Sequence, residues 1–374
     1  MAERSFVSEI KNLCNLTAFD YVISHNNYTT GKCNMDRRSF IKATAATAAA
    51  GAIMPNLASA ATSRLRVSNW LPAQHHMNSH ALVNWAAALS DASGGTLKLA
   101  VDPAPIAPPP AQYDVVRDGV ADIAYHVMAY TPGPFEIVRG VELPFLSPTA
   151  EIGSQAAWDW YDRNVGFDKE FDAVKVLTLF VHGPGAVHSK KRITTLEELA
   201  GVKLRVGGGG VAMSEALGAT PVAMPASKAY EAIQKGVADG AMFPWESIKG
   251  FKLGELLSHH LEIPGGLYTT PFAVIMNRKK YESLSDDHKQ VLENVGGAVG
   301  AQILGKAWDD ADVAGRAVAV EKGSEINSLG GSELERWAER VAFMNDGWIE
   351  KANARGLDGA ALLADLKETI AKYS

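Results

Sequence analysis

A short strand that runs directly into four glycines constrains this chain more than any other stretch. Hydrophobic residues alternate at Val202, Leu204 and Val206, and residues 207–210 are all glycine. Such alternation predicts a β-strand with one buried face, which places Arg205 on the opposite face near the C-terminal end of the strand. Open α/β sheets present their ligand crevice at that end, and glycine lets backbone approach a ligand closely. The stretch predicts an α/β fold with a site beside Arg205, although a solvated arginine before a flexible loop fits the same pattern.

Arg205 also has the side-chain chemistry of an anion anchor. A guanidinium is always charged and offers a planar fork of donors that matches a carboxylate. We therefore expect Arg205 to bind the carboxylate of a small ligand, with the backbone of Gly207 close to that ligand.

The composition is that of an ordinary soluble globular protein. Of the 374 residues, 47% are hydrophobic and 21% are charged, and the formal net charge is −6. A chain of this length usually forms two domains, each with its own core. No basic block or tail is present, so we expect no nucleic-acid partner.

The amino-terminal segment carries the pattern of an export signal. Arg37 and Arg38 precede Ser-Phe-Ile-Lys, a weakly apolar run covers residues 43–54, and Ala58-Ser59-Ala60 is a pattern that signal peptidases cut. Twin arginines in this setting are typical of the bacterial twin-arginine signal. We expect residues 35–60 to be this signal and the mature protein to act in the periplasm. Residues 1–34 precede it, and we interpret them as a non-native upstream extension.

Removal of residues 1–60 changes the chemistry that the mature chain can perform. Both cysteines, Cys14 and Cys33, lie in the removed part, so no disulfide, thiolate nucleophile or cysteine metal site is expected. The remainder has 30 Lys and Arg against 38 Asp and Glu, a net charge of −8. This charge suits a freely diffusing exported protein, and we expect it to be a monomer.

The mature chain alternates between short strands and helices. Strands at 64–68 and 96–101 enclose a helix through Trp85, which is a βαβ unit. Capping-box chemistry at Thr195 predicts a short helix from 196 onward. Further strands are expected at 122–127, 175–181, 186–189, 221–224, 241–245 and 272–277. Long helices are expected over 286–306 and beyond, and over 333–351.

Several of these stretches together resemble the substrate-binding proteins of TRAP transporters. They are GVADIA (119–124), LPFL (143–146), TTLEELAGVKLRV (194–206), ALGATP (216–221) and YEAIQKGVADG (230–240). Their order and spacing match the family over essentially all of residues 62–374, although no single motif is specific.

The resemblance implies a two-lobed α/β fold with a ligand cleft between the lobes and a long helix spanning both. We place lobe I at 62–183 plus 271–308 and lobe II at 184–270 plus 309–374. It also implies a periplasmic receptor without enzymatic activity, which delivers a small carboxylate to a TRAP membrane permease. The arginine at the position of Arg205 takes the ligand's carboxylate in that family.

Three departures from the family's patterns bear on the ligand. Sialate-binding members carry a second arginine where this chain has Gly185, and an asparagine where it has Phe243. A branch that binds 2-oxoacids with a metal ion has a glutamate where this chain has Met242. We therefore expect an apolar cleft with no metal, with Phe243 and Trp245 either lining it or packing in the core.

Other candidates follow the expected strand ends, and each has a plainer alternative. His75 and His76 fit a solvated turn as well as a cleft, and a zinc site would need further ligands that no suitable spacing supplies. Tyr125, His126 and Tyr130 fit core packing equally well. The full set of candidate ligand-binding residues comprises Asn69, Trp70, His75, His76, Tyr125, Tyr130, Gly185, Arg205, Gly207, Phe243, Trp245 and Tyr268.

The favoured ligand is a monocarboxylate with an aromatic or apolar body, with a short aliphatic 2-oxo or hydroxy acid as the second choice. Sugar acids are disfavoured, since their hydroxyls need partners that apolar walls lack. The rival function is an exported nicotinamide-dependent oxidoreductase, because glycines 207–210 fit a loose dinucleotide pattern and twin-arginine export favours proteins folded around a cofactor. We expect no cofactor, because the glycine pattern lies mid-chain and directly follows an arginine.

Overall fold

The computed structural model describes residues 62–374, and residues 60–374 form one compact unit. The upstream extension, the signal segment and both cysteines lie outside the described residues. Within the described range, no helix combines the length and apolar character needed to cross a membrane.

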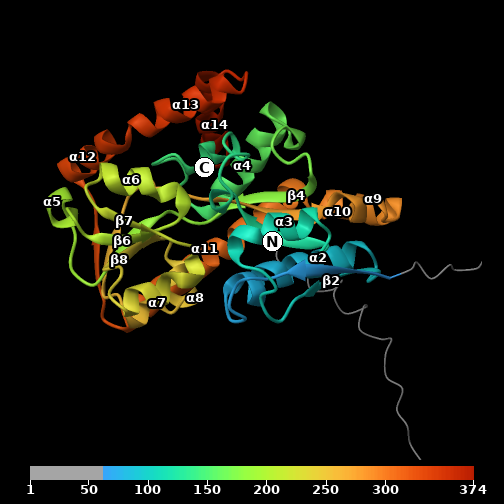
Figure 1. The fold of residues 1–374 in the computed structure, drawn as a ribbon, viewed down its shortest axis with the longest axis horizontal. Helices are drawn as coiled ribbons and strands as arrows, with labels where there is room; N and C mark the ends of the chain where they lie inside the picture. The colour runs from blue at the N-terminus through green and yellow to red at the C-terminus, as the bar shows by residue number, and fades with distance from the viewer. Residues whose placement is uncertain (1–61) are drawn as a thin grey trace, which may run out of the picture. The chain divides into compact units, whose positions relative to one another are not determined.

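The first sheet has five strands in the order β2-β1-β3-β10-β4. Its two edge strands, β2 and β4, are labelled in Figure 1. The pairs β1–β2 and β1–β3 are parallel, whereas β10 runs antiparallel to both of its neighbours. The strands are β1 (Ser63–Ser68), β2 (Leu97–Val101), β3 (Ile123–Val127), β4 (Val174–Val181) and β10 (Pro271–Asn277). The chain therefore returns to the first sheet after building the second, as two lobes joined by crossing segments require.

The second sheet has six strands in the order β11-β9-β5-β8-β6-β7. In its centre β6 is parallel to β7 and β8, while β5 is antiparallel to β8 and β9. The strands are β5 (Ala186–Ser189), β6 (Lys203–Val206), β7 (Thr220–Ala223), β8 (Gly240–Phe243), β9 (His259–Glu262) and β11 (Glu325–Ser328). The expected Arg205 strand is thus an interior strand, bonded on both edges.

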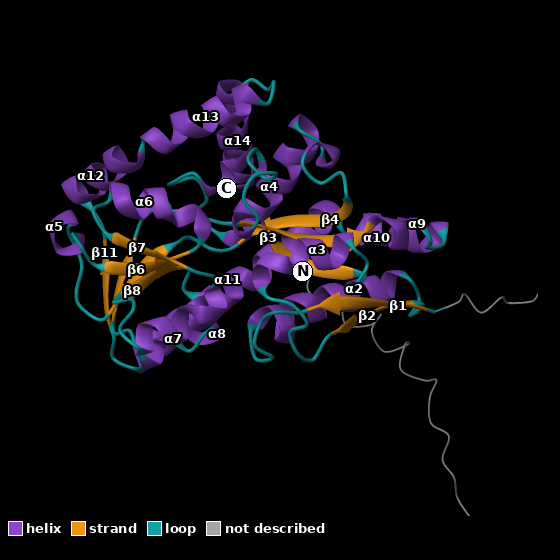
Figure 2. Ribbon diagram, in the orientation of Figure 1, coloured by secondary structure: helices purple, strands orange, loops and turns teal. Residues whose placement is uncertain are grey.

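Helices cover both sheets, which form two separate groups of strands in Figure 2. The helices up to the last strand of the first sheet are α2 (Leu82–Ala92), α3 (Gln112–Arg117), α4 (Ala150–Asn164), α5 (Leu196–Leu199), α6 (Val211–Ala216), α7 (Ala229–Gln234) and α8 (Glu246–Gly250). Those that follow are α9 (Arg278–Glu282), α10 (Asp286–Val295), α11 (Gly297–Glu321), α12 (Gly331–Val341), α13 (Phe343–Ala354) and α14 (Gly359–Tyr373). Thr195 caps α5 by accepting from the Glu198 N–H at 3.2 Å, which confirms the predicted capping chemistry.

Helix α11 packs against parts of both lobes, as the family resemblance implied. It contacts α4 and β4 on the side of the first sheet and α8 on the side of the second. Two glycines make these contacts close: a Cβ at Gly305 would lie 2.8 Å from the Ala150 carbonyl oxygen, and one at Gly315 would overlap the Trp245 carbonyl. The helix therefore ties the two sheets together directly through backbone contact.

The predicted long helices are each two helices in the structure. The first breaks between α10 and α11, where Gly297 adopts a φ of +50° that side chains disfavour. A Cβ at Gly296 would lie 2.5 Å from the Leu177 carbonyl oxygen, so the break also sits tightly against β4. The second changes direction at Ala342, between α12 and α13.

The carboxy-terminal helices do not follow the lobe boundary expected from the sequence. Residues 309–374 were assigned to lobe II, but α13 and α14 pack on the core of the first sheet (Figure 1). Trp160 of α4 donates to the Leu362 carbonyl at 3.0 Å, and Trp348 is buried beside it. Strands β9 and β11 and helix α14 had no counterpart in the sequence prediction. The two strands are four residues long and carry little periodic signal, whereas the helical spacing of Leu362, Leu366 and Ile370 in α14 was overlooked.

Candidate functional site

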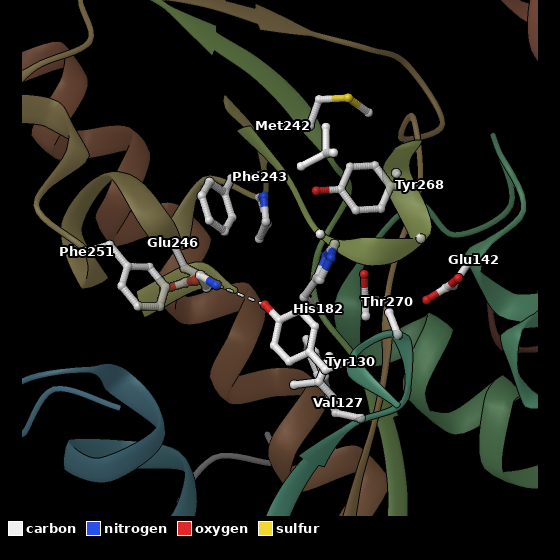
Figure 3. Close-up of a pocket in the computed structure, with 18 of the residues that line it drawn as sticks. Val127, Tyr130, Glu142, His182, Met242, Phe243, Glu246, Phe251, Tyr268 and Thr270 are labelled. Atoms are coloured by element: carbon white, nitrogen blue, oxygen red, sulfur yellow. Dashed lines mark hydrogen bonds between the residues drawn. The ribbon is translucent and has the colours of Figure 1, made fainter. Parts of the chain in front are cut away.

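Strand ends from both sheets meet at one pocket. Residues at or just beyond the C-terminal ends of β1, β3 and β4 line it from the first sheet, and those of β6 and β8 line it from the second. This is the edge at which α/β sheets bind ligands. Figure 3 shows Tyr130, His182, Phe243 and Tyr268 arranged around this pocket.

Arg205 lies in this pocket with its side chain 2% exposed. Its Nε and Nη2 donate to the Met224 carbonyl at 3.2 and 2.8 Å, and Nη2 also donates to the Tyr130 hydroxyl at 3.3 Å. Within residues 62–374 no carboxylate pairs with this guanidinium, and Nη1 takes part in none of its hydrogen bonds. Because a buried charge is costly unless it is paired, Arg205 is poised for an anionic ligand.

Phe243 forms the surface on which the guanidinium rests. The Arg205 Cζ lies 4.0 Å from the centre of the Phe243 ring, a cation–π geometry. Phe251 stacks on Phe243 with ring centres 5.9 Å apart and an interplanar angle of 25°. Both rings line the pocket, so Phe243 is a pocket residue rather than a core residue alone.

A continuous row of rings from the first sheet and α11 forms the rest of the apolar lining, which we call the aromatic wall: Trp70, Tyr125, Phe272 and Trp308. Trp70 stacks on Tyr125 at 5.4 Å, and Phe272 stacks on Trp308 at 5.4 Å. Tyr125 and Phe272 join the two pairs at 5.1 Å. A planar aromatic ligand would find offset or edge contacts along this wall.

Tyr130 connects the two lobes beside the anchor. Its hydroxyl accepts from Arg205 Nη2 and from the Ala226 N–H at 3.0 Å. The glycine run approaches the same segment, since a Cβ at Gly208 would lie 2.6 Å from the Ala129 carbonyl oxygen. The glycines therefore permit close packing of one lobe on the other, while Gly207 itself lines the pocket.

Polar groups are few in this lining. Burial lowers the pKa of His182 to about 4, so its ring is neutral at pH 7. His182 Nδ1 contacts the Gly183 carbonyl, which can only accept, so Nδ1 carries the proton and Nε2 keeps its lone pair. Burial, opposed by Arg139, raises the pKa of Glu142, whose Oε1 has no hydrogen-bond partner among the described residues.

Eight of the twelve predicted site residues line this pocket. They are Trp70, His75, Tyr125, Tyr130, Arg205, Gly207, Phe243 and Tyr268. The structure does not place Asn69, His76, Gly185 or Trp245 in the lining.

Two of those four are held by other contacts. Asn69 uses its amide locally, accepting from the Leu71 N–H at 2.9 Å and donating to the Leu71 carbonyl at 3.2 Å. Trp245 donates to Glu262 at 3.1 Å, and its ring packs against His188 and His260 behind β8. Strand alternation would put Trp245 on the same face as Phe243, but β8 ends at Phe243 and Trp245 already has helical dihedrals at the start of α8.

Gly185 does not line the pocket but contacts Tyr268, which does. A Cβ at this position would overlap the Tyr268 ring, and Gly185 N–H donates to the Tyr268 carbonyl at 2.8 Å. Tyr268 thus occupies the space that a longer side chain at Gly185 would need. His126 is fully buried against Tyr113 and Phe135, which is the core alternative stated for it.

Sequence reasoning missed several lining residues. Among them are Glu142, His182, Glu246, Phe251, Phe272 and Trp308. His182 follows a predicted strand directly and could have been proposed on that ground. Glu246 and Phe251 lie at the two ends of α8 and Trp308 lies in α11, and no local pattern marks them.

A two-lobed α/β fold with an unpaired buried cation between its lobes defines a solute-binding receptor. The profile of bacterial extracellular solute-binding protein family 7 matches residues 67–350 of this chain, and the protein belongs to that family. A twin-arginine translocation signal matches residues 34–54, which confirms export to the periplasm. The predicted resemblance to TRAP transporter substrate-binding proteins is likewise confirmed.

Solved structures of similar proteins carry bound aromatic acids. A TRAP solute-binding protein from Bordetella bronchiseptica with bound (R)- and (S)-mandelate is 34% identical, with a TM-score of 0.80 and coverage of 83% of this chain and 100% of that chain. One from Rhodoferax ferrireducens T118 with copurified benzoate is 33% identical, with a TM-score of 0.79 and coverage of 83% and 98%. A marine metagenome protein specific for aromatic acids, with 3-hydroxybenzoate, is 39% identical, with a TM-score of 0.79 and coverage of 84% and 99%.

Proposed function

We propose that this protein is a periplasmic receptor that captures a small aromatic monocarboxylate and delivers it to a TRAP membrane permease. The observation that carries the proposal is the Arg205 guanidinium, buried in the pocket and resting on Phe243 without a carboxylate partner among residues 62–374. A ligand carboxylate would pair with this charge and replace the water that it loses on burial.

The charge balance of the pocket favours one carboxylate over two. Arg205 is the one Arg or Lys among its described lining residues, whereas Glu142 and Glu246 are acidic. A dicarboxylate would bring its second negative charge near these groups without a second cation. The position at which some family members carry a second arginine is Gly185, and Tyr268 fills that space.

The shape and chemistry of the walls favour an aromatic body. The aromatic wall, Phe243 and Phe251 all line the pocket, so an aromatic ring held there buries its apolar area against them. Each such ring contact contributes about 0.5–1.5 kcal/mol beyond simple burial. The aromatic acids bound by the similar receptors from Bordetella and Rhodoferax support this ligand class.

The His182 ring favours a ligand that carries a hydroxyl group. Its neutral ring keeps a lone pair at Nε2, which can accept a hydrogen bond from a hydroxyl but repels a carboxylate. Mandelate and 3-hydroxybenzoate, which are bound by two similar proteins, both carry such a hydroxyl. We expect hydroxylated aromatic acids to bind more tightly than benzoate.

The oxidoreductase alternative is less consistent with the glycine loop. A Cβ at Gly209 would lie 2.8 Å from Glu142 Oε2, so the loop faces a carboxylate of the opposite lobe. A dinucleotide would need to place its negatively charged pyrophosphate on this loop. The family to which the chain belongs also has a solute-binding role, and we therefore propose a receptor without enzymatic activity.

Calorimetry on the exported protein, freed of copurified ligand by partial unfolding and refolding, tests the proposal. We expect tight one-to-one binding of benzoate, mandelate and 3-hydroxybenzoate, weak binding of pyruvate, and no binding of uronates or C4-dicarboxylates. Preferential binding of a uronate or a C4-dicarboxylate would reject the ligand class. A nicotinamide or flavin absorption spectrum in the purified protein, or turnover of the bound acid, would reject the receptor role.

A further inference from the structure

Three metal-ligating side chains come together where the two lobes meet. His75 and His76 follow β1 of the first sheet, and Glu246 begins α8 after β8 of the second. Their side chains are 1%, 10% and 2% exposed. The sequence analysis found no third ligand at a suitable spacing for the histidine pair, and Glu246 lies 170 residues after His76 along the chain.

The spacing of the three ligand atoms fits a metal coordination shell, and the two contacts to the carboxylate are also ion-pair distances. Glu246 Oε2 lies 3.3 Å from His75 Nε2 and 3.5 Å from His76 Nδ1, and all three atoms lie within 4.8 Å of one another. None of them has a hydrogen-bond partner among the described residues. Ligands at about 2.0–2.1 Å from a tetrahedral zinc ion are separated by about 3.4 Å, which matches both contacts to the carboxylate.

We propose that His75, His76 and Glu246 bind one divalent transition-metal ion, and by ligand chemistry Zn²⁺. Two imidazoles and one carboxylate form a three-ligand set that zinc accepts, with a water molecule in the fourth position. Neutral nitrogen ligands select zinc-like ions over Ca²⁺ and Mg²⁺, which prefer all-oxygen shells. His75 and Glu246 also line the Arg205 pocket, so the ion would lie at the edge of the ligand site, on residues other than the Arg205 anchor.

Neighbouring groups hold the ligands in place and leave a path to solvent. Glu246 Oε1 accepts from the Ser247 hydroxyl at 2.7 Å, and the His76 ring packs edge-on against Trp308 at 4.3 Å. A second, more polar pocket opens on His76 and Glu246 and is lined by Gln74, Ser79, His80, Asn84 and Asp310 among others. Supporting contacts and an entry path are both features of a metal site.

His75 needs one adjustment to bind the metal. The Met77 N–H donates to His75 Nδ1 at 3.3 Å, so in this arrangement Nδ1 is the accepting nitrogen and the ring hydrogen lies on Nε2. A ring that binds metal through Nε2 carries its proton on Nδ1 instead, and the long Met77 contact is given up. We therefore expect His76 and Glu246 to contribute more to the affinity than His75.

The position of the site gives the metal a consequence for the whole receptor. Because the histidines belong to one lobe and the glutamate to the other, a bound ion would link the two lobes directly. Any ligand that binds this arrangement and not a separated one stabilises the closed form by mass action. Metal should therefore raise the melting temperature and slow the release of a carboxylate held in the pocket.

The test uses the exported protein, purified without a metal-affinity tag and treated with chelator. Zn²⁺ alone is titrated by calorimetry, and Co²⁺ is used as a spectroscopic probe because tetrahedral cobalt absorbs strongly in the visible range. We expect one ion per chain and a tetrahedral cobalt spectrum. His76→Ala and Glu246→Gln should each weaken Zn²⁺ binding by at least about tenfold, as loss of ligand-shell groups does.

The matched control is His259→Ala, which removes a partly exposed imidazole on β9 that lines neither pocket and should leave metal binding unchanged. Absence of Zn²⁺ and Co²⁺ binding to the wild-type protein would overturn the proposal, whatever the variants do. Binding that His76→Ala and Glu246→Gln leave intact, or that His259→Ala abolishes, would also overturn it. Circular dichroism shows which variants are folded, and His76→Asn replaces His76→Ala if the latter is not.

Discussion

The Arg205 guanidinium carbon lies 4.0 Å from the centre of the Phe243 ring, although the two residues come from different strands of the second sheet. Strands β6 and β8 are adjacent and parallel, with Arg205 in register with Ala241, so Phe243 follows at the end of the neighbouring strand. The anchor for the carboxylate and the first apolar contact for the ligand's body are therefore parts of one sheet edge. Substitutions at these two positions should affect binding in different ways.

Replacement of Arg205 should have the largest effect on ligand affinity. Removing one member of a buried charge pair costs about 3–5 kcal/mol, so Arg205→Ala should weaken binding of benzoate by a factor of hundreds or more. Arg205→Lys should restore only part of this, because an ammonium cannot reproduce the planar fork. Calorimetry measures both, with the exposed Arg117→Ala as control. An Arg205→Ala variant within about tenfold of wild type would place the anchor elsewhere.

Replacement of Phe243 should change which acids bind. Phe243→Leu removes the cation–π and ring contacts, worth about 0.5–1.5 kcal/mol, and should weaken aromatic acids about threefold to tenfold while affecting pyruvate less. The half-exposed Phe343→Leu serves as control, since that ring is 51% exposed. Equal weakening of pyruvate and benzoate would show that Phe243 supports Arg205 rather than contacting the ligand's ring.

The Gly185 position should tolerate no side chain without damage to the site. A Cβ at Gly185 would push the Tyr268 ring, which lines the pocket, so Gly185→Ala should weaken benzoate binding by more than about tenfold. Gly347→Ala is the control, because a Cβ there meets nothing within 4 Å. Both variants are compared by calorimetry and thermal unfolding. Unchanged affinity in Gly185→Ala would mean that Tyr268 moves freely and does not shape the pocket.

Acid should destabilise the protein partly through His182. Burial lowers its folded-state pKa from 6.5 to about 4, so the unfolded chain binds more protons between these values. The contribution of His182 to stability is complete above pH 6.5 and is lost as the pH falls toward 4, on the order of 1–3 kcal/mol. His182→Gln should therefore reduce the difference between the free energies of unfolding that urea titrations give at pH 7 and at pH 4.5.

The control is His80→Gln, at an exposed histidine, which should leave the difference in unfolding free energy between pH 7 and pH 4.5 unchanged. His126, His188 and His260 also have pKa values lowered by burial, to about 3, 3 and 4, so an acid-dependent loss should remain after His182 is replaced. An identical pH dependence in His182→Gln and wild type would show that His182 is hydrated in the folded protein.

The local patterns of the sequence predicted most individual strands and the anchor of the site. Alternation at Val202, Leu204 and Val206 predicted β6, and that strand's end correctly placed Arg205 at the ligand edge. The hydrophobic periodicity predicted one helix across Gly296 and Gly297, where the structure has a break. The break comes from close backbone packing against β4, and an apolar face can continue on both sides of such a break.

Membership of the pocket was harder to predict than the anchor. Phe243 and Trp245 have similar side chains and lie two residues apart, yet only Phe243 lines the pocket. The turn from β8 into α8 decides between them, since it directs Trp245 toward His188 and Glu262. Pro244 lies between the two residues and marks the end of the strand, a local signal that the prediction of a strand over 241–245 did not use.

The sequence by itself determined the export signal and the α/β class, and it predicted Arg205 as the carboxylate anchor with apolar neighbours, because these depend on residue type and local order. Only the tertiary structure decided which distant residues meet. Glu246 joins His75 and His76, and α13 and α14 return to the first sheet, through contacts between segments far apart in the chain. Such contacts are fixed by the packing of whole elements against one another, and no local pattern of residues encodes them.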